Sequence, residues 1–376
     1  MEKQTAQLKI EPPPEKQQID KAWIALERLK SVRDWSPREL FKQLEIMGYV
    51  GQEEARRRLC LMAYRHIRRL KDHFLDNIPI EKLPTKSNVL MVGPTGCGKS
   101  FLAELLFGKI LGVPVATVDM TGFVETGYMG RYVSEILYEL KTTAHNNFFW
   151  AKMGICILDE FDKISGAGSN IRFGGGGTTK DVSGYGVQRG LLKLFEGGKH
   201  KIACKGPLGT QPDECLETDC ISFVACGAFT GIKEIAVRNQ GSNFGFRRGS
   251  NEEQTGGTAY KLTQDDISSV EIFSTYGFLP ELIGRFSSIS RLNPLGENDL
   301  KTILQRNVLP KYKQEFKREG QKLSVPHEII EKIVKKAIER KTGARGLSLL
   351  LTEHFENQAF ELFGKNSSDA SDDIPF

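Results

Sequence analysis

The stretch NVLMVGPTGCGKSFLAELLFGKILG, residues 88–112, decides the fold, because a short apolar run passes through a glycine-rich turn into a helical pattern. Within it, G-P-T-G-C-G-K-S fits the phosphate-loop pattern G-x-x-x-x-G-K-[ST]. In such a loop the glycines let backbone N–H groups turn inward around an anion at the start of a helix. An ordinary strand-to-helix turn is the alternative interpretation. The predicted nucleotide-binding residues here are Gly93, Pro94, Thr95, Gly96, Cys97, Gly98, Lys99, Ser100 and Phe101.

Catalysis needs further groups beside the phosphates. Lys99 is expected to bring a positive charge to the outer phosphates, and the Ser100 hydroxyl can ligate Mg²⁺. A second stretch, GICILDEFDKI, is an apolar run that ends in Asp159 and Glu160. We expect Asp159 beside the Mg²⁺ and Glu160 as the base that orients and deprotonates the attacking water. Two acids at a strand end are also common in solvated loops, so this interpretation depends on the phosphate loop upstream.

Apolar runs alternate with helical patterns through most of the chain. Strands separated by helices indicate a mostly parallel sheet that is covered on both faces. In SPREL, Ser36 is a predicted helix cap and Glu39 completes a capping box, with Pro37 in the first turn. The glycine-rich stretches 165–181 and 239–258 are predicted loops. The predicted strands are residues 88–92, 115–118, 154–158 and 221–226.

After about residue 292 helical periodicity dominates, as in HEIIEKIVKKAIERK and GLSLLLTEHFENQAFELF. The predicted fold class is therefore α/β, with a phosphate-loop large domain followed by a smaller, mainly helical domain. The predicted domains are a disordered lead at 1–19, the large ATPase domain at 20–292, the small domain at 293–364 and a polar tail at 365–376.

The composition argues against several classes of protein. Of the 376 residues, 39% are hydrophobic and 26% are charged, which is typical of a globular chain. No apolar run reaches the ~20 residues of a membrane helix. The N-terminal sequence lacks the apolar core of a secretion signal and carries acids that a mitochondrial presequence avoids. We expect a cytoplasmic protein without a membrane partner, or one in an organelle matrix if a targeting segment was removed.

The net charge and the cysteine content argue against a nucleic-acid-binding surface and against a disulfide framework. A net charge of +5 favours an ordinary solvated surface over a nucleic-acid footprint. The seven cysteines include no C-x-x-C pair, and their odd number argues against a complete disulfide framework. Reduced thiols are therefore expected. A zinc site made of His200, Cys204, Cys215 and Cys220 would fit no standard spacing.

Five stretches in this order resemble the ClpX family of AAA+ unfoldases: GPTGCGKS, ILDEFDKI, DVSGYGVQRGLLKLFEG, GFLPELIGRF and KTGARGL. The resemblance covers about residues 51–350. It implies an ATP hydrolase that uses ATP and Mg²⁺ to unfold protein substrates and thread them through a homo-oligomeric ring, expected to be hexameric. It also implies delivery of the substrate to a ClpP-like protease ring. The family's N-terminal Cys₄ module has no counterpart here, since the first cysteine is Cys60, so no zinc is expected.

The resemblance also assigns residues around the nucleotide. Arg285, in GFLPELIGRF, corresponds to the arginine finger that reaches the nucleotide of the neighbouring subunit. Arg345, in KTGARGL, corresponds to the sensor arginine of the small domain, with Gly343 ending the preceding helix. GYVGQ resembles the segment that holds adenine, with Tyr49 and Val50 as its apolar contacts, although the family usually has Tyr-Val-Ile there.

Three further stretches resemble loops that contact proteins. TGYMGRY resembles the pore loop, in which Tyr128 and Met129 would grip the substrate. GGKHK partly matches a basic loop at the pore entrance, where Lys199 and His200 would attract a substrate tag. GSNFGFRRG lies where the family carries its loop for docking on the protease, and the expected docking residues are Phe244, Gly245 and Phe246.

Three alternatives remain open at this stage. The chain could act as a chaperone or remodeller without a protease. A nucleic-acid-remodelling ATPase would use the same engine, but nothing in the sequence resembles a base-stacking platform or a basic stripe, and no nucleic-acid partner is expected. A scaffold that binds ATP without hydrolysing it is disfavoured, because Lys99, Glu160 and Arg285 are all present.

Overall fold

The computed structural model describes residues 14–123, 132–166, 184–202, 214–242 and 263–363. Its centre is a five-stranded sheet with the order β2-β3-β6-β1-β7, and every pair of neighbouring strands is parallel. The four predicted strands are confirmed to within a residue or two. The strands are β1 (Val89–Val92), β2 (Val115–Asp119), β3 (Ile155–Asp159), β6 (Ser222–Gly227) and β7 (Ser288–Arg291).

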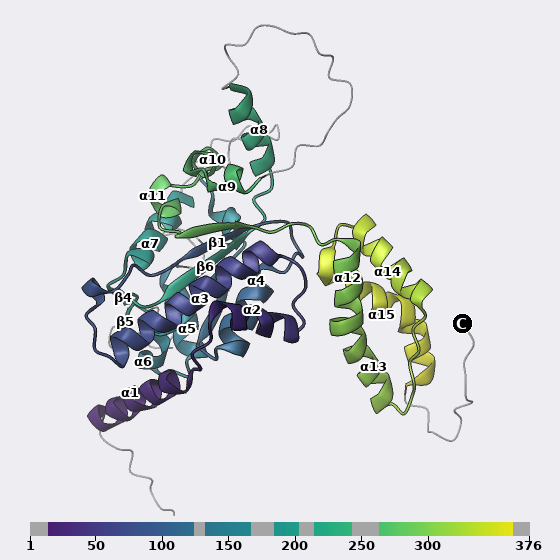
Figure 1. Ribbon diagram of the computed structural model, residues 1–376, viewed down its shortest axis with the longest axis horizontal. Helices are drawn as coiled ribbons and strands as arrows, with labels where there is room; N and C mark the ends of the chain where they lie inside the picture. Colours follow the sequence, from purple (N-terminus) through teal and green to yellow (C-terminus); the bar gives the residue numbers. More distant parts are fainter. Residues whose placement is uncertain (1–13, 124–131, 167–183, 203–213, 243–262, 364–376) are drawn as a thin grey trace, which may run out of the picture.

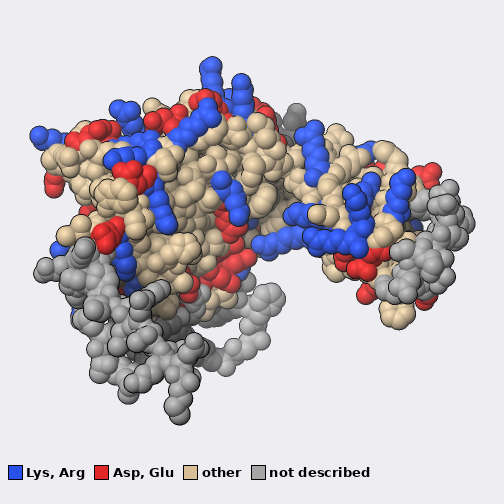
Figure 2. Space-filling view, turned by 90° about the horizontal axis from the view of Figure 1, so that it is seen from below, with Lys and Arg blue, Asp and Glu red and all other residues tan. Residues whose placement is uncertain are grey.

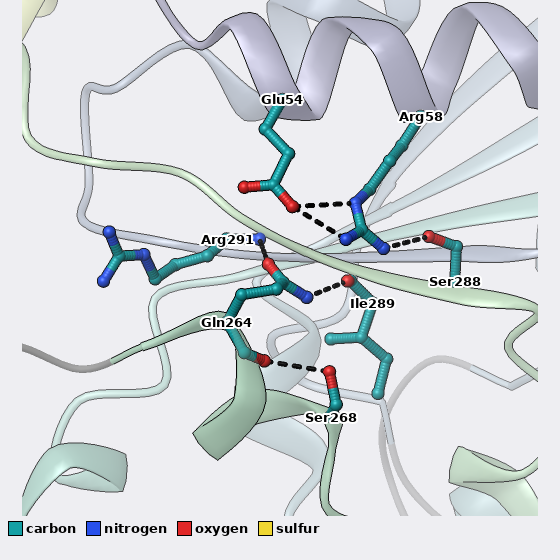
Figure 3. A network of polar contacts seen from close by, with 7 residues as sticks. All are labelled: Glu54, Arg58, Gln264, Ser268, Ser288, Ile289 and Arg291. Carbon is teal, nitrogen blue, oxygen red and sulfur yellow. Dashed lines mark hydrogen bonds and ion pairs between the residues drawn. The ribbon is translucent and has the colours of Figure 1, made fainter.

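The fifth strand, β7, was not predicted. It lies at the edge of the sheet, where Ser288 and Ile289 pair with Val89 and Leu90 of β1. The side chain of Gln264 lies along its outer side: Gln264 Nε2 donates to Ile289 O at 2.7 Å, and Arg291 N donates to Gln264 Oε1 at 3.1 Å (Figure 3). One amide side chain thus satisfies two main-chain groups of an edge strand that would otherwise be open to solvent or to another chain.

Helices cover the sheet, and α3 (Glu53–Phe74) crosses it in contact with β1 and β7 (Figure 1). The predicted capping box is confirmed at α2 (Pro37–Ile46), where Ser36 Oγ accepts from Glu39 N and Ser36 N donates to the Glu39 carboxylate. The other helical elements of the large domain are α1 (Pro14–Ser31), η1 (Ile80–Lys82), α4 (Lys99–Ala103), η2 (Glu104–Ile110), α5 (Ser134–Thr143), α6 (Phe148–Ala151), η3 (Phe161–Ile164), α7 (Gly184–Glu196), α8 (Ile232–Ser242), α9 (Gln264–Ser268), α10 (Val270–Tyr276) and α11 (Pro280–Ile283).

A second hydrophobic core lies in the helices that follow β7. The first core ends with Leu292, and the second is made by residues from Leu300 to Phe355. The two cores form two lobes, with Lys and Arg side chains gathered where the smaller lobe meets the larger one (Figure 2). The described helical elements of the small lobe are α12 (Glu297–Ile303), η4 (Leu304–Val308), α13 (Leu309–Arg318), α14 (His327–Glu339) and α15 (Gly343–Leu362).

Three local expectations were wrong. Helix α1 begins at Pro14, inside the predicted disordered lead, because proline suits a first helical position and the Glu, Lys and Gln that follow are good helix formers. Helix α8 extends over 239–242, which we predicted as loop. The predicted GGKHK loop contains strand β4 (Lys199–Lys201), which pairs antiparallel with β5 (Cys215–Glu217).

The part of the chain described above contains no helix that is both long enough and apolar enough to cross a membrane.

Candidate functional site

The phosphate loop follows β1 and leads into α4, as the sequence predicts. Gly96 and Gly98 have φ of +77° and +92°, a backbone region that suits glycine and little else. The buried Lys99 ammonium reaches back across the turn, where its Nζ donates to Gly93 O at 2.7 Å and to Pro94 O at 2.9 Å. The loop is therefore closed around a positive charge whose hydrogen bonds go to carbonyl groups, and these can be exchanged for phosphate oxygens.

Ser100 and Asp159 meet although 59 residues separate them. Ser100 Oγ donates to Asp159 Oδ2 at 2.7 Å, which joins the start of α4 to the end of β3. Hydroxyl and carboxylate oxygens are the ligand types that Mg²⁺ prefers in nucleotide sites, so this pair fits a magnesium nucleotide.

Glu160 lies directly after β3 and beside this pair. Its backbone is left-handed, with φ of +53°, and its N–H donates to Asp159 Oδ1 at 3.0 Å. Such a conformation is uncommon for a residue with a side chain and is enriched at functional sites. The turn places the half-buried Glu160 in the wall of the same cavity as Lys99 and Ser100.

One cavity collects these groups. Its walls come from the phosphate loop, the end of β3, the end of β6 and the first turn of α15. The lining residues are Thr95, Gly96, Gly98, Lys99, Ser100, Phe101, Asp159, Glu160, Gly227, Ala228, Ala344 and Arg345.

The small domain therefore forms part of this wall. Ala344 N donates to Gly96 O at 3.1 Å, so the N-terminal turn of α15 touches the phosphate loop directly. The preceding helix α14 ends at Glu339, so Gly343, with φ of +58°, does not end that helix as expected but begins α15, and Arg345 lies in the first turn of α15. A charged side chain of the small domain is thus at the rim of a cavity built mostly by the large domain.

Tyr49 contacts the phosphate loop, but neither Tyr49 nor Val50 lines the cavity. Tyr49 is buried, its hydroxyl donates to Gly98 O at 3.2 Å, and its ring stacks on Phe101 with centroids 6.1 Å apart. Burial raises the pKa of the Tyr49 phenol well above its usual range, so it stays a donor. Phe101 is instead half exposed and forms part of the cavity wall. Cys97 points into the core, where burial raises the pKa of its thiol.

Arg285 is outside this cavity. It follows α11, and its Nη2 forms an ion pair with Glu196 Oε1 at 2.6 Å at the end of α7. Both side chains line a separate cavity on the side of the sheet where β1 begins, together with Asn88. The structure thus brings Lys99, Ser100, Asp159, Glu160 and Arg345 together and leaves Arg285 elsewhere.

The residues expected to contact proteins are only partly described. Tyr128, Met129 and the tripeptide Phe244, Gly245 and Phe246 lie outside the described residues. Lys199 is exposed and pairs with Glu217 at 3.6 Å across the β4–β5 ribbon, and His200 Nε2 is 3.0 Å from Gly197 O. Among the described residues, no group of three His, Cys, Asp or Glu side chains is placed to hold a metal ion.

Three residues that line the nucleotide cavity, and Glu196, which pairs with Arg285, have no role that the sequence predicts. Gly227, Ala228 and Ala344 line the nucleotide cavity through small side chains and backbone, so no residue type marks them in a sequence. Glu196 lies in the stretch DVSGYGVQRGLLKLFEG, but nothing in the sequence assigns it a role.

Comparison with known protein families matches both lobes. Residues 84–289 match the AAA domain (Cdc48 subfamily), and residues 295–374 match the C-terminal, D2-small domain of ClpB protein. These matches and the parallel sheet followed by helices confirm the predicted fold class.

Curated relatives match most of the chain. A protein of Bacteroides fragilis is 37% identical over 339 residues, which is 86% of this chain and 78% of that protein. Relatives from Bacteroides thetaiotaomicron and Porphyromonas gingivalis are 36% and 35% identical over 86% of this chain and 78% and 79% of their own lengths. Each is named "ATP-dependent Clp protease ATP-binding subunit ClpX". The resemblance seen in the sequence motifs is thereby confirmed: the chain is an ATPase and belongs to the ClpX family.

Proposed function

We propose that this chain is one subunit of an ATP-driven ring that unfolds protein substrates, threads them through its centre and delivers them to a ClpP-like protease. The relatives' names, which refer to the ATP-binding subunit of a Clp protease, support the partnership. A homo-oligomer, expected to be hexameric, an ATP–Mg²⁺ substrate and a cytoplasmic location belong to the same proposal.

The observation that carries the proposal is the cavity wall shared by two domains. The phosphate loop comes from the large domain, while Ala344 and Arg345 come from the small one. Arg345 lines this cavity, and in this proposal it pairs with the terminal phosphate. Loss of that phosphate would remove a charged contact between two separately folded units, so their relative angle can change. Hydrolysis can in this way produce the movement that pulls on a substrate.

The geometry on one side of this cavity supports the chemical roles that we propose for its residues. Lys99 exchanges its two carbonyl contacts for phosphate oxygens and neutralises their charge. Ser100 and Asp159 would hold Mg²⁺, which when bound would neutralise charge on the phosphate oxygens. Glu160, held in place by its own backbone bond to Asp159, orients a water for attack and accepts its proton.

The position of Arg285 supports action on a neighbouring subunit. Asn88 Nδ2 donates to Arg285 O at 3.1 Å at the start of β1, whereas the phosphate loop begins at Gly93 beyond its end. The five residue steps from Asn88 to Gly93, at about 3.3 Å each, separate these two residues by about 17 Å. Arg285 thus lies far from the phosphate loop of its own subunit, and in this proposal a second subunit brings a triphosphate to it.

The experiment is a comparison of Tyr128→Ala and Phe246→Ala with the unchanged protein, on a folded, tagged substrate with and without a ClpP-like protease. We expect Tyr128→Ala to abolish unfolding while most of the ATPase rate remains, because an aromatic side chain grips many sequences without recognising one. Tyr64→Ala removes an exposed tyrosine of α3 and is the control. Unfolding at the normal rate by Tyr128→Ala would refute the pore assignment.

The same experiment separates the alternatives. Phe246→Ala is expected to retain unfolding and to lose degradation, because a hydrophobic tripeptide suits a pocket on a partner ring. Unfolding that is never coupled to the protease would indicate a protease-independent chaperone. An ATPase rate that rises with added DNA or RNA and falls steeply with salt would indicate a nucleic-acid remodeller instead.

A further inference from the structure

We propose that Glu196, at the end of helix α7, is a positioning residue. Its carboxylate holds the side chain of Arg285, the proposed arginine finger, in a fixed direction. This inference rests on the proposed role of Arg285 in a neighbour's nucleotide site. Glu196 acts there through Arg285, whose side chain it holds.

The ion pair leaves most of the guanidinium free. Arg285 Nη2 donates to a single carboxylate oxygen, Glu196 Oε1, at 2.6 Å. The two side chains are 48% and 45% exposed, so the remaining N–H groups of the fork face a solvent-accessible space. A guanidinium held at one edge and open at the other is suited to presenting its free donors to an anion in a fixed plane.

The backbone of Arg285 is fixed independently of its side chain. Asn88 is 2% exposed; its Nδ2 donates to Arg285 O, and its Oδ1 accepts from Phe223 N at 3.0 Å. Ser287 N and Ser287 Oγ both donate to Asn88 O at 2.9 Å. The segment around Arg285 is thus tied to the buried start of β1. The freedom that remains is rotation of the arginine side chain, and that is what Glu196 restricts.

Helix α7 is also tied to the segment that leads to Arg285. Gln188 is fully buried; its Oε1 accepts from Leu279 N at 2.8 Å, directly before α11. Its Nε2 donates to Ile164 O at 2.8 Å and to Gly277 O at 3.0 Å. Ile164 ends the short helix η3 that follows Glu160. Through Gln188, helix α7 therefore contacts Gly277 and Leu279, which precede Arg285 in the chain. It also contacts Ile164, which follows Glu160.

This arrangement links two functions in one subunit. Gln188 joins α7 to the chain that follows Asp159 and Glu160, and Glu196, two turns further on, holds the arginine that serves the next site. A shift of η3 would be transmitted through α7 to Arg285. The residue pair is thus placed to make the finger respond to the state of its own subunit's site.

The test is a double-mutant cycle on the assembled, full-length protein. The variants are Glu196→Ala, Arg285→Ala and the double variant, with steady-state ATPase kcat and KM as the measurements. Glu196→Ala is expected to lower kcat about tenfold, because a misdirected catalytic group loses rate steeply with displacement. KM for ATP is expected to change by less than about twofold. The double variant is expected to be no slower than Arg285→Ala alone, since Glu196 acts through Arg285.

Two further variants exclude a purely structural effect. Glu196→Gln keeps an oxygen that can accept from the guanidinium and is expected to restore part of kcat. Glu353→Ala breaks a matched ion pair, to Arg340 at 3.2 Å with side chains 44% and 48% exposed, and is expected to keep kcat. Its Tm is expected to match that of Glu196→Ala.

The outcomes are distinct. An unchanged kcat in Glu196→Ala, or a double variant slower than Arg285→Ala by the whole Glu196→Ala factor, overturns the positioning role and leaves the finger assignment standing. An unchanged kcat in Arg285→Ala overturns the finger assignment and the positioning role with it.

Discussion

Gly96 of the phosphate loop and Gly343 of the small domain are in backbone contact. A Cβ added to Gly343 would lie 2.7 Å from Gly96 O, and one added to Gly96 would lie 2.6 Å from Thr342 O. Carbon atoms do not approach backbone oxygens so closely without displacement of one of them. Both residues also have positive φ, which favours glycine. The two domains therefore meet at a point where neither Gly96 nor Gly343 can be replaced by a residue with a side chain.

Gly343→Ala is expected to push the start of α15 away from the phosphate loop. Arg345 moves with it, so we expect ATPase kcat to fall by about tenfold or more, because a misplaced charged group loses its stabilising effect steeply with distance. The fold should survive, since the hydrophobic cores of both domains lie elsewhere. ATPase assays together with circular dichroism would check both expectations.

Gly112→Ala is the matched control for that variant. Gly112 has φ of +68°, similar to the +58° of Gly343, but a Cβ there would meet no atom within 4 Å. It therefore introduces the same backbone strain without the collision. Equal losses of kcat in the two variants would mean that strain alone, rather than domain contact, explains the effect.

Two inactive variants are expected to restore each other's activity. Arg285→Ala keeps an intact Glu160, and Glu160→Gln keeps an intact Arg285; each alone should hydrolyse ATP at least about a hundredfold more slowly. In a mixed ring, an Arg285→Ala subunit can receive its finger from a Glu160→Gln neighbour. Random mixing at equal amounts produces this pairing at about one quarter of the interfaces. We therefore expect the mixture to recover up to about a quarter of the normal rate.

The measurement is the ATPase rate of the mixture, after the subunits have exchanged, compared with that of each variant alone. Mixing Arg285→Ala with the double variant Glu160→Gln, Arg285→Ala is the control, because no finger is then available to an intact site. Recovery in the control, or none in the test mixture, would show that Arg285 does not act between subunits.

Burial of His66 predicts a loss of stability in mild acid. Desolvation lowers the pKa of His66 from 6.5 to about 4, while its ring nitrogens lie 3.1 Å from Ser222 Oγ and Met153 O. Below pH 6.5 the unfolded chain binds a proton that the folded chain refuses until about pH 4. The free energy of unfolding should therefore decrease as the pH falls across this window, by roughly 3 kcal/mol for this group.

Urea unfolding of the large domain between pH 7 and pH 4.5 measures this slope. His66→Gln should be less stable at pH 7 but should lose less stability on acidification. His327→Gln changes an exposed histidine of α14 and should keep the full slope. An identical slope in His66→Gln and the unchanged protein would show that other groups cause the acid sensitivity.

Buried, apolar elements were the predictable part of the fold. Strands β1, β3 and β6 contain the apolar runs VLMV, ICIL and FVAC, and the start of α2 follows from the reciprocal bonds of Ser36 and Glu39. Strand β7 has the sequence S-I-S-R, and β4 has K-H-K. Neither run is apolar, because each lies at an edge and its stability comes from partners distant in the sequence, such as Gln264 for β7.

The candidate site likewise has features that the sequence predicts and features that depend on tertiary packing. The phosphate loop and the Asp159–Glu160 pair are local patterns. The 2.7 Å contact between Ser100 and Asp159 is possible because β1 and β3, with β6 between them, end at the same edge of the parallel sheet. The contact of Gly96 with Gly343 and the ion pair of Arg285 with Glu196 depend on how whole elements pack. Their residue types are common on any surface, so the sequence alone does not mark the pairing.

The last prediction concerns Gln264, whose side chain contacts the edge strand β7. Gln264→Ala removes the two hydrogen bonds between this side chain and β7. These are the bond donated to Ile289 O and the bond accepted from Arg291 N, and both are partly buried. We expect the free energy of unfolding to fall by about 1–2 kcal/mol, because unsatisfied buried groups are costly. Hydrogen exchange at the Arg291 amide should accelerate, since its acceptor is gone, and exposure of the edge should increase aggregation.

Ser268→Ala is the control, because it removes one hydrogen bond to the main chain of Gln264 and leaves the side chain in place (Figure 3). Gln264→Glu separates the two contacts: its carboxylate still accepts from Arg291 N but has no donor for Ile289 O. It should keep the slow exchange of the Arg291 amide and lose part of the stability. If Gln264→Ala leaves that exchange slow, the edge of β7 must be protected by something other than this side chain, and its predicted role in closing the sheet is wrong.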